Sequence, residues 1–147
     1  MSGSSPPAAV SEPVELPSPS TRGSNDPVPL SETGFPALRR SASRSDLVQF
    51  AAATRDWNPI HWDHDSAVAA GLPTIVVHGL LQAAWLLSAA SVLSPQAAPI
   101  ADARFRFRSP MVAGSEGAFT GDIVGTQASA RLAIGDREIV SATMTLR

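Results

Sequence analysis

The spacing of apolar residues predicts helices in the first half of the folded region. One apolar stripe recurs at intervals of three and four residues, which predicts a helix with one buried face ending at about Thr54. The stripe consists of Leu47, Phe50, Ala51 and Thr54. Ser45 is the expected N-cap of this helix, and Asp46 would stabilise its first turn. A short strand over residues 37–43 is expected before the helix.

The most apolar segment, residues 79–93, predicts a second helix with apolar side chains around nearly its whole circumference. Its polar residues do not share a face at about 100° per residue; they are Gln82, Ser88 and Ser91. We expect such a helix to be buried on most sides, which requires a sheet that curls around it. Between the two helices, a short helix over residues 66–70 is expected, with Asp63 or Asp65 as its cap and Gly71 at its end.

The remaining chain predicts four antiparallel strands. Their expected ranges are 103–108, 118–124, 128–134 and 137–146. In the first of them Phe105 and Phe107 alternate with arginines, which is the period of a half-buried strand. Gly135-Asp136 predicts a two-residue hairpin between the last two strands. Helices followed by a run of strands indicate the α+β class.

The composition divides the 147-residue chain into a tail and one domain. Residues 1–31 hold seven prolines and many serines, and they predict a disordered tail ahead of a folded domain over residues 32–147. The tail lacks the charged start and apolar run of a secretory signal, so we expect a cytoplasmic protein. No segment is long and apolar enough to predict a membrane span.

Absent residue types and charge exclude several functions. The chain has no cysteine, which excludes disulfides, thiolate nucleophiles and cysteine-ligated zinc. It also has no lysine and no tyrosine, which excludes a lysine Schiff base and a tyrosine acid or nucleophile. The net charge of −2 gives no general attraction to nucleic acid.

All three histidines lie in one short stretch with a distinctive polar cluster. Asp56 and His61 flank the turn formed by Asn58 and Pro59, so both side chains can point into one pocket. His78 directly precedes the apolar helix, whose first N–H groups have no partner within the helix. A carboxylate, an imidazole and free N–H groups are the components of an acid–base site for a carbonyl compound. An ordinary surface turn is the alternative, since Asp, Asn and Pro are common in turns.

This cluster resembles the MaoC-like family of (R)-specific enoyl-CoA hydratases and 3-hydroxyacyl-thioester dehydratases. Residues 55–61 look like the family's Gly-Asp-x-Asn-Pro-hydrophobic-His run, and His78-Gly79 looks like its helix-opening pair. Residues 105–111 are similar to the strand after the family's central helix. The resemblance covers roughly residues 43–125. It implies a hotdog fold, in which a curved antiparallel sheet wraps around a long central helix.

The resemblance also implies roles for individual residues. Asp56 and His61 would be the acid–base pair that adds water to a trans-2-enoyl thioester or removes it from an (R)-3-hydroxyacyl thioester. Asn58 would brace the loop or hold the water, and the N–H of Gly79 would stabilise the enolate oxygen. His78 would orient the substrate or the catalytic loop, or it would be only a structural or capping histidine.

Arg55 departs from the family pattern, which has glycine at this place. If the backbone is left-handed there, Arg55 costs roughly 1–2 kcal/mol of strain. Its guanidinium could instead reach a phosphate of the thioester carrier. A third interpretation is that Arg55 marks a catalytically weakened subunit.

Other polar residues have simpler expected roles. His64 is expected to be solvated. A metal site formed by Asp56, His61 and His64 is disfavoured because Pro59 interrupts regular helix and no remote ligand set completes it. The row of Arg104, Arg106 and Arg108 predicts either a solvated sheet surface or a phosphate-facing row. Trp57 and Trp62, which flank the motif, are expected to pack in the core or to form pocket walls.

The sequence therefore predicts an acyl-thioester hydro-lyase without a metal or redox cofactor. Coenzyme A or phosphopantetheine would enter only as part of the substrate. The resemblance implies a homodimer, or a heterodimer with a related hotdog subunit. Two rival functions remain at this point: a hotdog acyl-CoA thioesterase, and a non-catalytic subunit of a hetero-oligomeric dehydratase.

Overall fold

The computed structural model describes residues 38–93 and 99–147. The predicted tail over residues 1–31 lies outside the described residues. The helices are α1 (Arg44–Thr54), the short 3-10 helix η1 (Pro59–His61), α2 (His64–Ala69) and α3 (Gly79–Leu93). The strands are β1 (Arg39–Arg40), β2 (Ile100–Phe107), β3 (Gly117–Val124), β4 (Gln127–Ile134) and β5 (Arg137–Leu146). The first strand is therefore much shorter than the predicted 37–43, whereas the four later strands are confirmed to within a few residues.

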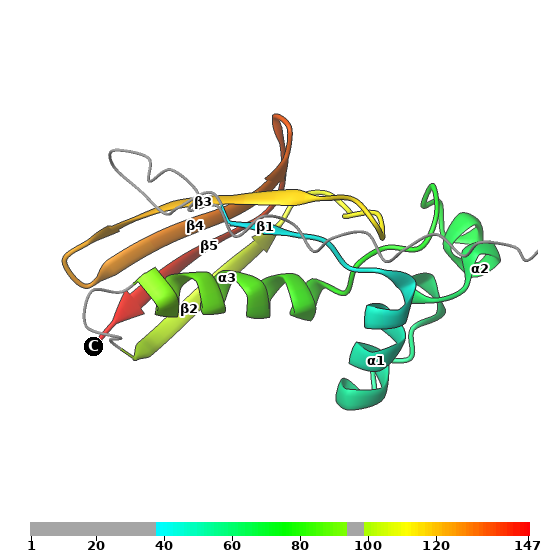
Figure 1. Ribbon diagram of the computed structural model, residues 1–147, viewed down its shortest axis with the longest axis horizontal. Coiled ribbons are helices and arrows are strands. Elements are labelled where there is room, and N and C mark those ends of the chain that lie inside the picture. Colours follow the sequence, from blue (N-terminus) through cyan, green and yellow to red (C-terminus); the bar gives the residue numbers. More distant parts are fainter. Residues whose placement is uncertain (1–37, 94–98) are drawn as a thin grey trace, which may run out of the picture.

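A five-stranded antiparallel sheet with one long helix on its face forms the body of the molecule (Figure 1). The strand order is β1-β3-β4-β5-β2, and every paired strand is antiparallel. The predicted hairpin joins β4 to β5, where Ile134 pairs with Arg137 and Gly135 has a φ of 57°. A positive φ at the first loop position is what a two-residue hairpin of this kind requires of glycine. The predicted α+β class and hotdog arrangement are confirmed.

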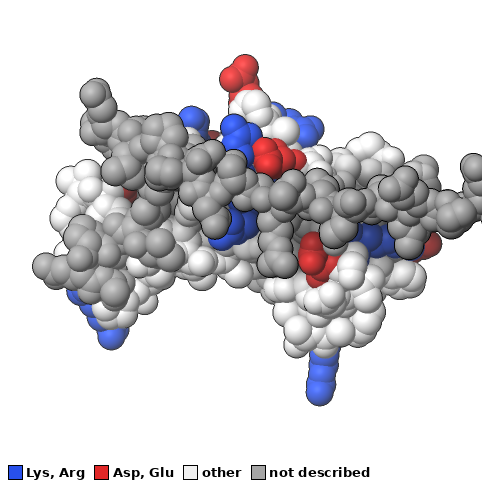
Figure 2. Space-filling view, in the orientation of Figure 1, with Lys and Arg blue, Asp and Glu red and all other residues white. Residues whose placement is uncertain are grey.

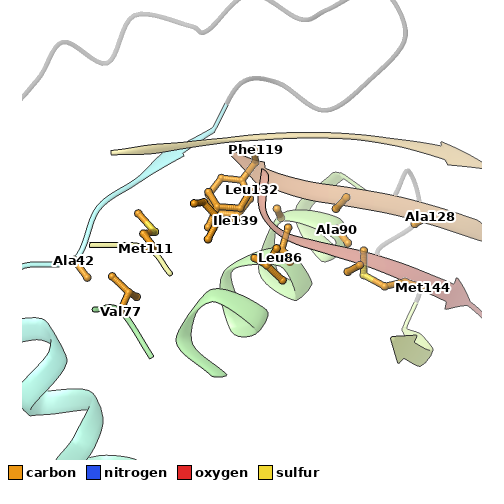
Figure 3. Packing of buried hydrophobic residues seen from close by; sticks show 14 of the residues in the cluster. Ala42, Val77, Leu86, Ala90, Met111, Phe119, Ala128, Leu132, Ile139 and Met144 are labelled. Atoms are coloured by element: carbon orange, nitrogen blue, oxygen red, sulfur yellow. The ribbon is translucent and has the colours of Figure 1, made fainter. Parts of the chain in front are cut away.

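The core lies between α3 and the sheet (Figure 3). Leu86 and Ala90 of α3 face a group of buried side chains from the strands. The labelled members of that group include Phe119, Leu132 and Ile139. Burial of each large apolar side chain contributes on the order of 1.5–3 kcal/mol. This packing holds α3 on the sheet, with its first turn at the end of the sheet that lies toward α1 (Figure 1).

The prediction that α3 is buried on most sides holds except along one stripe of the helix. Leu80 is 63% exposed, and Ala84, Ser88 and Ser91 are exposed as well. These four residues recur at intervals of three and four, so they form one open stripe along the helix. The sheet covers one side of α3 and does not reach around to this stripe.

Helix α1 begins two residues earlier than predicted. Its N-cap is Ser43, because the Ser43 hydroxyl accepts a hydrogen bond from the N–H of Asp46 at 3.2 Å. The Asp46 carboxylate in turn accepts from the N–H of Ser43 at 2.8 Å, which completes a capping box. The Ser43 hydroxyl, which donates to the Asp46 carboxylate at 2.7 Å, and the Ser43 N–H hold the pKa of Asp46 below its usual value. The predicted end at Thr54 is confirmed, but Thr54 itself is exposed rather than buried.

Of the two residues predicted as the N-cap of α2, Asp63 and Asp65, the structure confirms Asp63. The carboxylate of Asp63 accepts a hydrogen bond from the N–H of Ser66 at 2.9 Å, so Asp63 is the N-cap and Asp65 lies in the first turn. Gly71 follows the helix with a φ of 83°, as its predicted place after the C-cap requires. Within residues 38–93 and 99–147, no helix has both the length and the apolar character that a membrane crossing needs.

Candidate active site

The loop that carries the acidic residue begins with a left-handed turn at Arg55. Arg55 has φ 61° and ψ 22°, and it is the C-cap of α1. Among the described residues other than glycine, it alone has a positive φ. The sequence predicts strain at Arg55 if its backbone is left-handed, and the backbone is left-handed here. The turn ends α1 and directs the following residue, Asp56, toward the start of α3.

Local hydrogen bonds define the shape of the motif after Arg55. The carboxylate of Asp56 accepts from the N–H of Asn58 at 3.4 Å, and the side-chain oxygen of Asn58 accepts from the N–H of Ile60 at 3.3 Å. Asn58 is exposed and caps η1, so it braces the loop as one of its two predicted roles states. The carbonyl of Ile60 accepts from the N–H of Val76 at 3.1 Å, which ties the loop to the segment before α3.

His61 is buried, and one hydrogen bond determines its tautomer. Its Nδ1 lies 2.7 Å from the backbone carbonyl oxygen of Val76. Because a carbonyl only accepts hydrogen bonds, Nδ1 carries the proton in the neutral ring and Nε2 is left with a lone pair. Ring nitrogens of His61 and His78 and a carboxylate oxygen of Asp56 all lie within 4.8 Å of one another. The loop thus brings a potential base and a carboxylate together.

His78 is the second ring of this group, and it is fully buried. Its ring stacks on His61 with centroids 3.8 Å apart, and it also contacts the ring of Phe50 at 5.0 Å. Nε2 donates to the backbone carbonyl of Asp56 at 3.3 Å, which links α3 to the acidic loop. Burial, and secondarily the charge of His61, lower the pKa of His78, so its ring is neutral near neutral pH. The hydrogen bond joins His78 to the acidic loop, and both an orienting role and a purely structural role stay predictions.

Gly79 opens α3 directly after His78. The first backbone hydrogen bond of the helix runs from the N–H of Gln82 to the carbonyl of His78 at 3.2 Å, so the N–H of Gly79 has no acceptor within the helix. A β-carbon on Gly79 would lie only 3.3 Å from Cε1 of Phe107. Glycine at this position therefore accommodates the Phe107 ring as well as leaving the N–H open to approach.

Three chemically different groups thus meet at one end of the sheet: a carboxylate, a histidine with a free Nε2, and a helix N-terminus. Such a set can move protons and stabilise a developing negative charge on an oxygen. The planes of the His61 and His78 rings lie at 22° to each other. Asp56, His61 and His78 also lie close enough together for each to offer one ligand atom to a metal ion, a set that differs from the one considered from the sequence.

His64 does not join this group. It is exposed, and its Nδ1 lies 3.1 Å from the hydroxyl of Thr74. The alternative metal set that included His64 is therefore not assembled. Trp57, beside Asp56, is 51% exposed, and the indole N–H of Trp62 donates to the carbonyl of Trp57 at 3.1 Å. The expectation of core packing is therefore wrong for Trp57, whereas Trp62 is half-buried.

The arginine row faces away from the core, although Arg108 directly follows Phe107, whose ring lies against Gly79. Arg104, Arg106 and Arg108 are all exposed on the side of β2 opposite the core. Arg108 pairs with Glu138 at 3.1 Å, and Arg104 lies 3.7 Å from the carboxylate of Asp102. Basic and acidic side chains are also interspersed on the face shown in Figure 2. These observations support the solvated-surface interpretation of the row.

Two residues near the site were not predicted from the sequence to belong to it. Gln82 is buried in α3, and its amide donates to the carbonyl of Val77 at 3.0 Å. A polar residue in an otherwise apolar helix was the available signal for Gln82. Phe107 lies against Gly79 across 28 positions of sequence. Hydrophobic alternation along a strand gives no sign of such a contact.

Comparisons with known proteins found a family model and a relative with similar sequences. The family model described as the MaoC like domain matches residues 21–143. A 3-hydroxyacyl-[acyl-carrier-protein] dehydratase, mitochondrial, from Arabidopsis thaliana is 35% identical over 77 residues, which are 52% of this chain and 46% of the relative. The chain thus spans about half the length of the curated relative that it matches.

Solved structures share the fold. A MaoC-like dehydratase superimposes with a TM-score of 0.71 at 28% identity, over 78% of this chain and 39% of that one. The ChsH1-ChsH2 complex from Mycobacterium tuberculosis gives 0.67 at 24% identity, over 78% and 95%. The (R)-hydratase from A. caviae involved in PHA biosynthesis gives 0.68 at 20% identity, over 80% and 96%.

Proposed function

Because this chain belongs to the MaoC-like domain family, we propose that it catalyses the reversible hydration of trans-2-enoyl thioesters to (R)-3-hydroxyacyl thioesters. The observation that carries the proposal is the meeting of Asp56 with His61, whose Nδ1 is engaged by the carbonyl of Val76. The engaged Nδ1 leaves Nε2 as a base. The hydratase and dehydratase names of its relatives support the same class of reaction.

In the hydration direction, Asp56 and His61 hold one water molecule between them. Nε2 of His61 takes a proton from this water as its oxygen forms a bond to C3 of the substrate. The electrons of the double bond move toward the carbonyl and give an enolate. The pair then returns a proton to C2, so that water is added overall and the site regains its starting protonation. Dehydration follows the same steps in reverse.

The enolate oxygen is assigned to the N–H of Gly79. This N–H lies at the start of α3, where it has no acceptor within the helix and where the helix dipole favours negative charge. Charge that develops there is stabilised by a donor already in place, which is the usual source of large rate effects at such sites. In this proposal His78 positions the Asp56 loop through its hydrogen bond to the Asp56 carbonyl, and Asn58 braces the turn.

The proposed reaction uses acid–base chemistry alone and needs neither a metal nor a redox cofactor. Coenzyme A or a phosphopantetheine carrier belongs to the substrate. Arg55 is exposed next to the motif, and in this proposal its guanidinium pairs with a phosphate of that carrier. The open stripe of α3 would be covered by a second hotdog subunit, either an identical chain or a related one.

Loss of the conjugated enoyl-thioester absorbance tests the proposal. Purified protein is added to short and medium trans-2-enoyl-CoA substrates, and Asp56→Asn and His61→Gln are compared with wild type. We expect each variant to lower kcat by about 100-fold or more, because each removes a proton-transfer group. His64→Gln is the matched control, since His64 lies outside the group, and it should keep wild-type activity.

Other outcomes of the same assay would contradict the proposal. Release of free thiol, followed with a thiol reagent, would instead identify a thioesterase. Hydration that persists in both site variants would exclude the assigned pair. If an assembly with a related subunit is active and Asp56→Asn leaves that activity unchanged, this chain is the non-catalytic partner.

A further inference from the structure

Phe107 ends β2 where this strand passes the first turn of α3. Phe105 packs against the core, and strand alternation places Phe107 on the same face of the sheet. The contact with Gly79 confirms this orientation, since a β-carbon there would lie 3.3 Å from Cε1 and 3.5 Å from Cζ of Phe107. The ring thus lies against the residue whose N–H is assigned to the substrate carbonyl.

The other side of the Phe107 ring is open. The residue is 52% exposed although it packs on Gly79. Two further large apolar side chains are similarly exposed beside site residues: Leu80 follows Gly79, and Trp57 follows Asp56. Exposed apolar side chains that gather around polar groups are typical of ligand sites. Phe107 is the one of the three that the structure places in direct contact with a site residue.

The chemistry of a thioester decides which part of it can meet this ring. The carbonyl carbon bears two substituents, C2 of the acyl group and the sulfur. In the proposed function, C2 and C3 must lie at Asp56 and His61. The polar side-chain atoms of these two residues lie close to those of His78, the residue before Gly79. The substituent that remains for Phe107 is the sulfur with the first methylene of the carrier arm. Divalent sulfur and aromatic rings attract one another.

We propose that Phe107 binds the thiol side of the substrate, with its ring against the thioester sulfur, and so helps to hold the carbonyl on the N–H of Gly79. This inference rests on the proposed function. If it is correct, Phe107 recognises the thioester linkage and does not contact the acyl chain. Substrates that differ only in acyl length must therefore respond equally to a change at this position.

The test compares Phe107→Leu and Phe107→Ala with wild type on two acyl lengths. Calorimetry gives Kd for butyryl-CoA and octanoyl-CoA, which are saturated and cannot be hydrated, and the absorbance assay gives kcat/KM for the matching enoyl thioesters. We expect Phe107→Ala to weaken binding about two- to tenfold, by the same factor for both lengths. Phe107→Leu keeps an apolar side chain on Gly79 and controls for folding.

Val124→Ala is the matched surface control. Val124 is also a large exposed apolar residue, but it ends β3 at the opposite end of the sheet from the start of α3 (Figure 1). It should bind both saturated thioesters as wild type does. A loss in the Phe107 variants that grows with acyl length would place the ring on the acyl side and overturn the inference, and so would unchanged binding.

The two proposals fail in distinguishable ways. If wild type binds the saturated thioesters but hydrates no enoyl thioester, the proposed function is wrong and the binding comparison still decides the role of Phe107. If hydration is normal and the Phe107 variants show length-dependent losses, only the inference on Phe107 is wrong. If wild type binds no thioester of either length, both are wrong.

Discussion

The rings of His61 and His78 stack with their centroids 3.8 Å apart and an angle of 22° between their planes. His61 donates from Nδ1 to Val76, and His78 donates from Nε2 to Asp56. Each ring thus holds a different backbone segment, and the stack fixes the two segments against each other. Protonating His78 would place a buried charge beside His61, so the stack is stable only while His78 stays neutral.

This relationship predicts a pH-dependent stability. The pKa of His78 is lowered in the fold from its ordinary value of 6.5, chiefly by burial. Between the two values the unfolded chain binds more protons than the folded one, so stability is present above pH 6.5 and falls as the pH drops below it. We expect the urea midpoint of wild type to fall in this range, and that of His78→Gln to fall less.

The choice of glutamine keeps an N–H that can reach the Asp56 carbonyl while removing the titrating ring. Urea unfolding at several pH values between 5 and 8, a range on either side of the ordinary pKa of histidine, provides the measurement. His64→Gln removes an exposed histidine and serves as the comparison. An equal change of pH dependence in both variants would show that the effect does not arise from burial of His78.

Arg55 predicts a stabilising substitution. Its left-handed backbone, with φ 61°, disfavours any residue with a β-carbon. We expect Arg55→Gly to raise the free energy of unfolding by about 1 kcal/mol, because glycine adopts this conformation without strain. Arg55→Ala removes the same guanidinium but keeps the β-carbon, so it should give no comparable gain. Equal stability of the two variants in thermal unfolding would mean that the turn is not strained.

Much of the fold could be predicted because it depends on local pattern. The bounds of α3 follow from an apolar run after His78, and the β4–β5 hairpin follows from a glycine at a two-residue loop. The hotdog arrangement and the roles of individual residues came through family resemblance, whereas the cluster of Asp56, His61 and His78 was evident from the residues themselves. Ser43 and Ser45 are chemically identical candidates for the cap of α1, so only the backbone geometry distinguishes them.

What the sequence could not show depends on contacts between distant segments. The open stripe at Leu80 arises because one sheet covers one side of a helix, whatever the composition of the other side. The stack of His61 on His78 and the packing of Phe107 on Gly79 depend on how separate elements meet. Periodicity specifies which face of an element is buried, but it does not name the partner across the interface.

The contact between Gly79 and Phe107 predicts non-additive substitutions. Gly79→Ala places a β-carbon 3.3 Å from the ring, a tight contact that the half-exposed ring can relieve by a small shift. We expect a change of less than about 1 kcal/mol in stability, since alanine also favours helix. The kcat/KM should nevertheless fall at least about tenfold, because the methyl group crowds the approach to the assigned N–H.

A double-mutant cycle with Phe107→Leu measures that contact directly. Residues in contact usually give interaction free energies of about 0.5 kcal/mol or more. The unfolding free energies of the two single variants and the double variant are compared with wild type. Simple additivity in the cycle would show that the methyl group and the ring do not meet.

The capping box of α1 predicts opposite outcomes for two serines. Ser43→Ala removes the acceptor for the N–H of Asp46 and should cost about 1 kcal/mol, whereas Ser45→Ala should be close to neutral. The difference should shrink in acid. Hydrogen bonds with Ser43 lower the pKa of Asp46. The stability that the Asp46 carboxylate contributes is therefore present above the ordinary value of 3.8 and is lost as the pH falls below it. Thermal unfolding of both variants at pH 7 and near pH 3, chosen to lie on either side of an ordinary Asp pKa, tests this prediction. A larger loss of stability for Ser45→Ala than for Ser43→Ala would show that Ser45 is the N-cap.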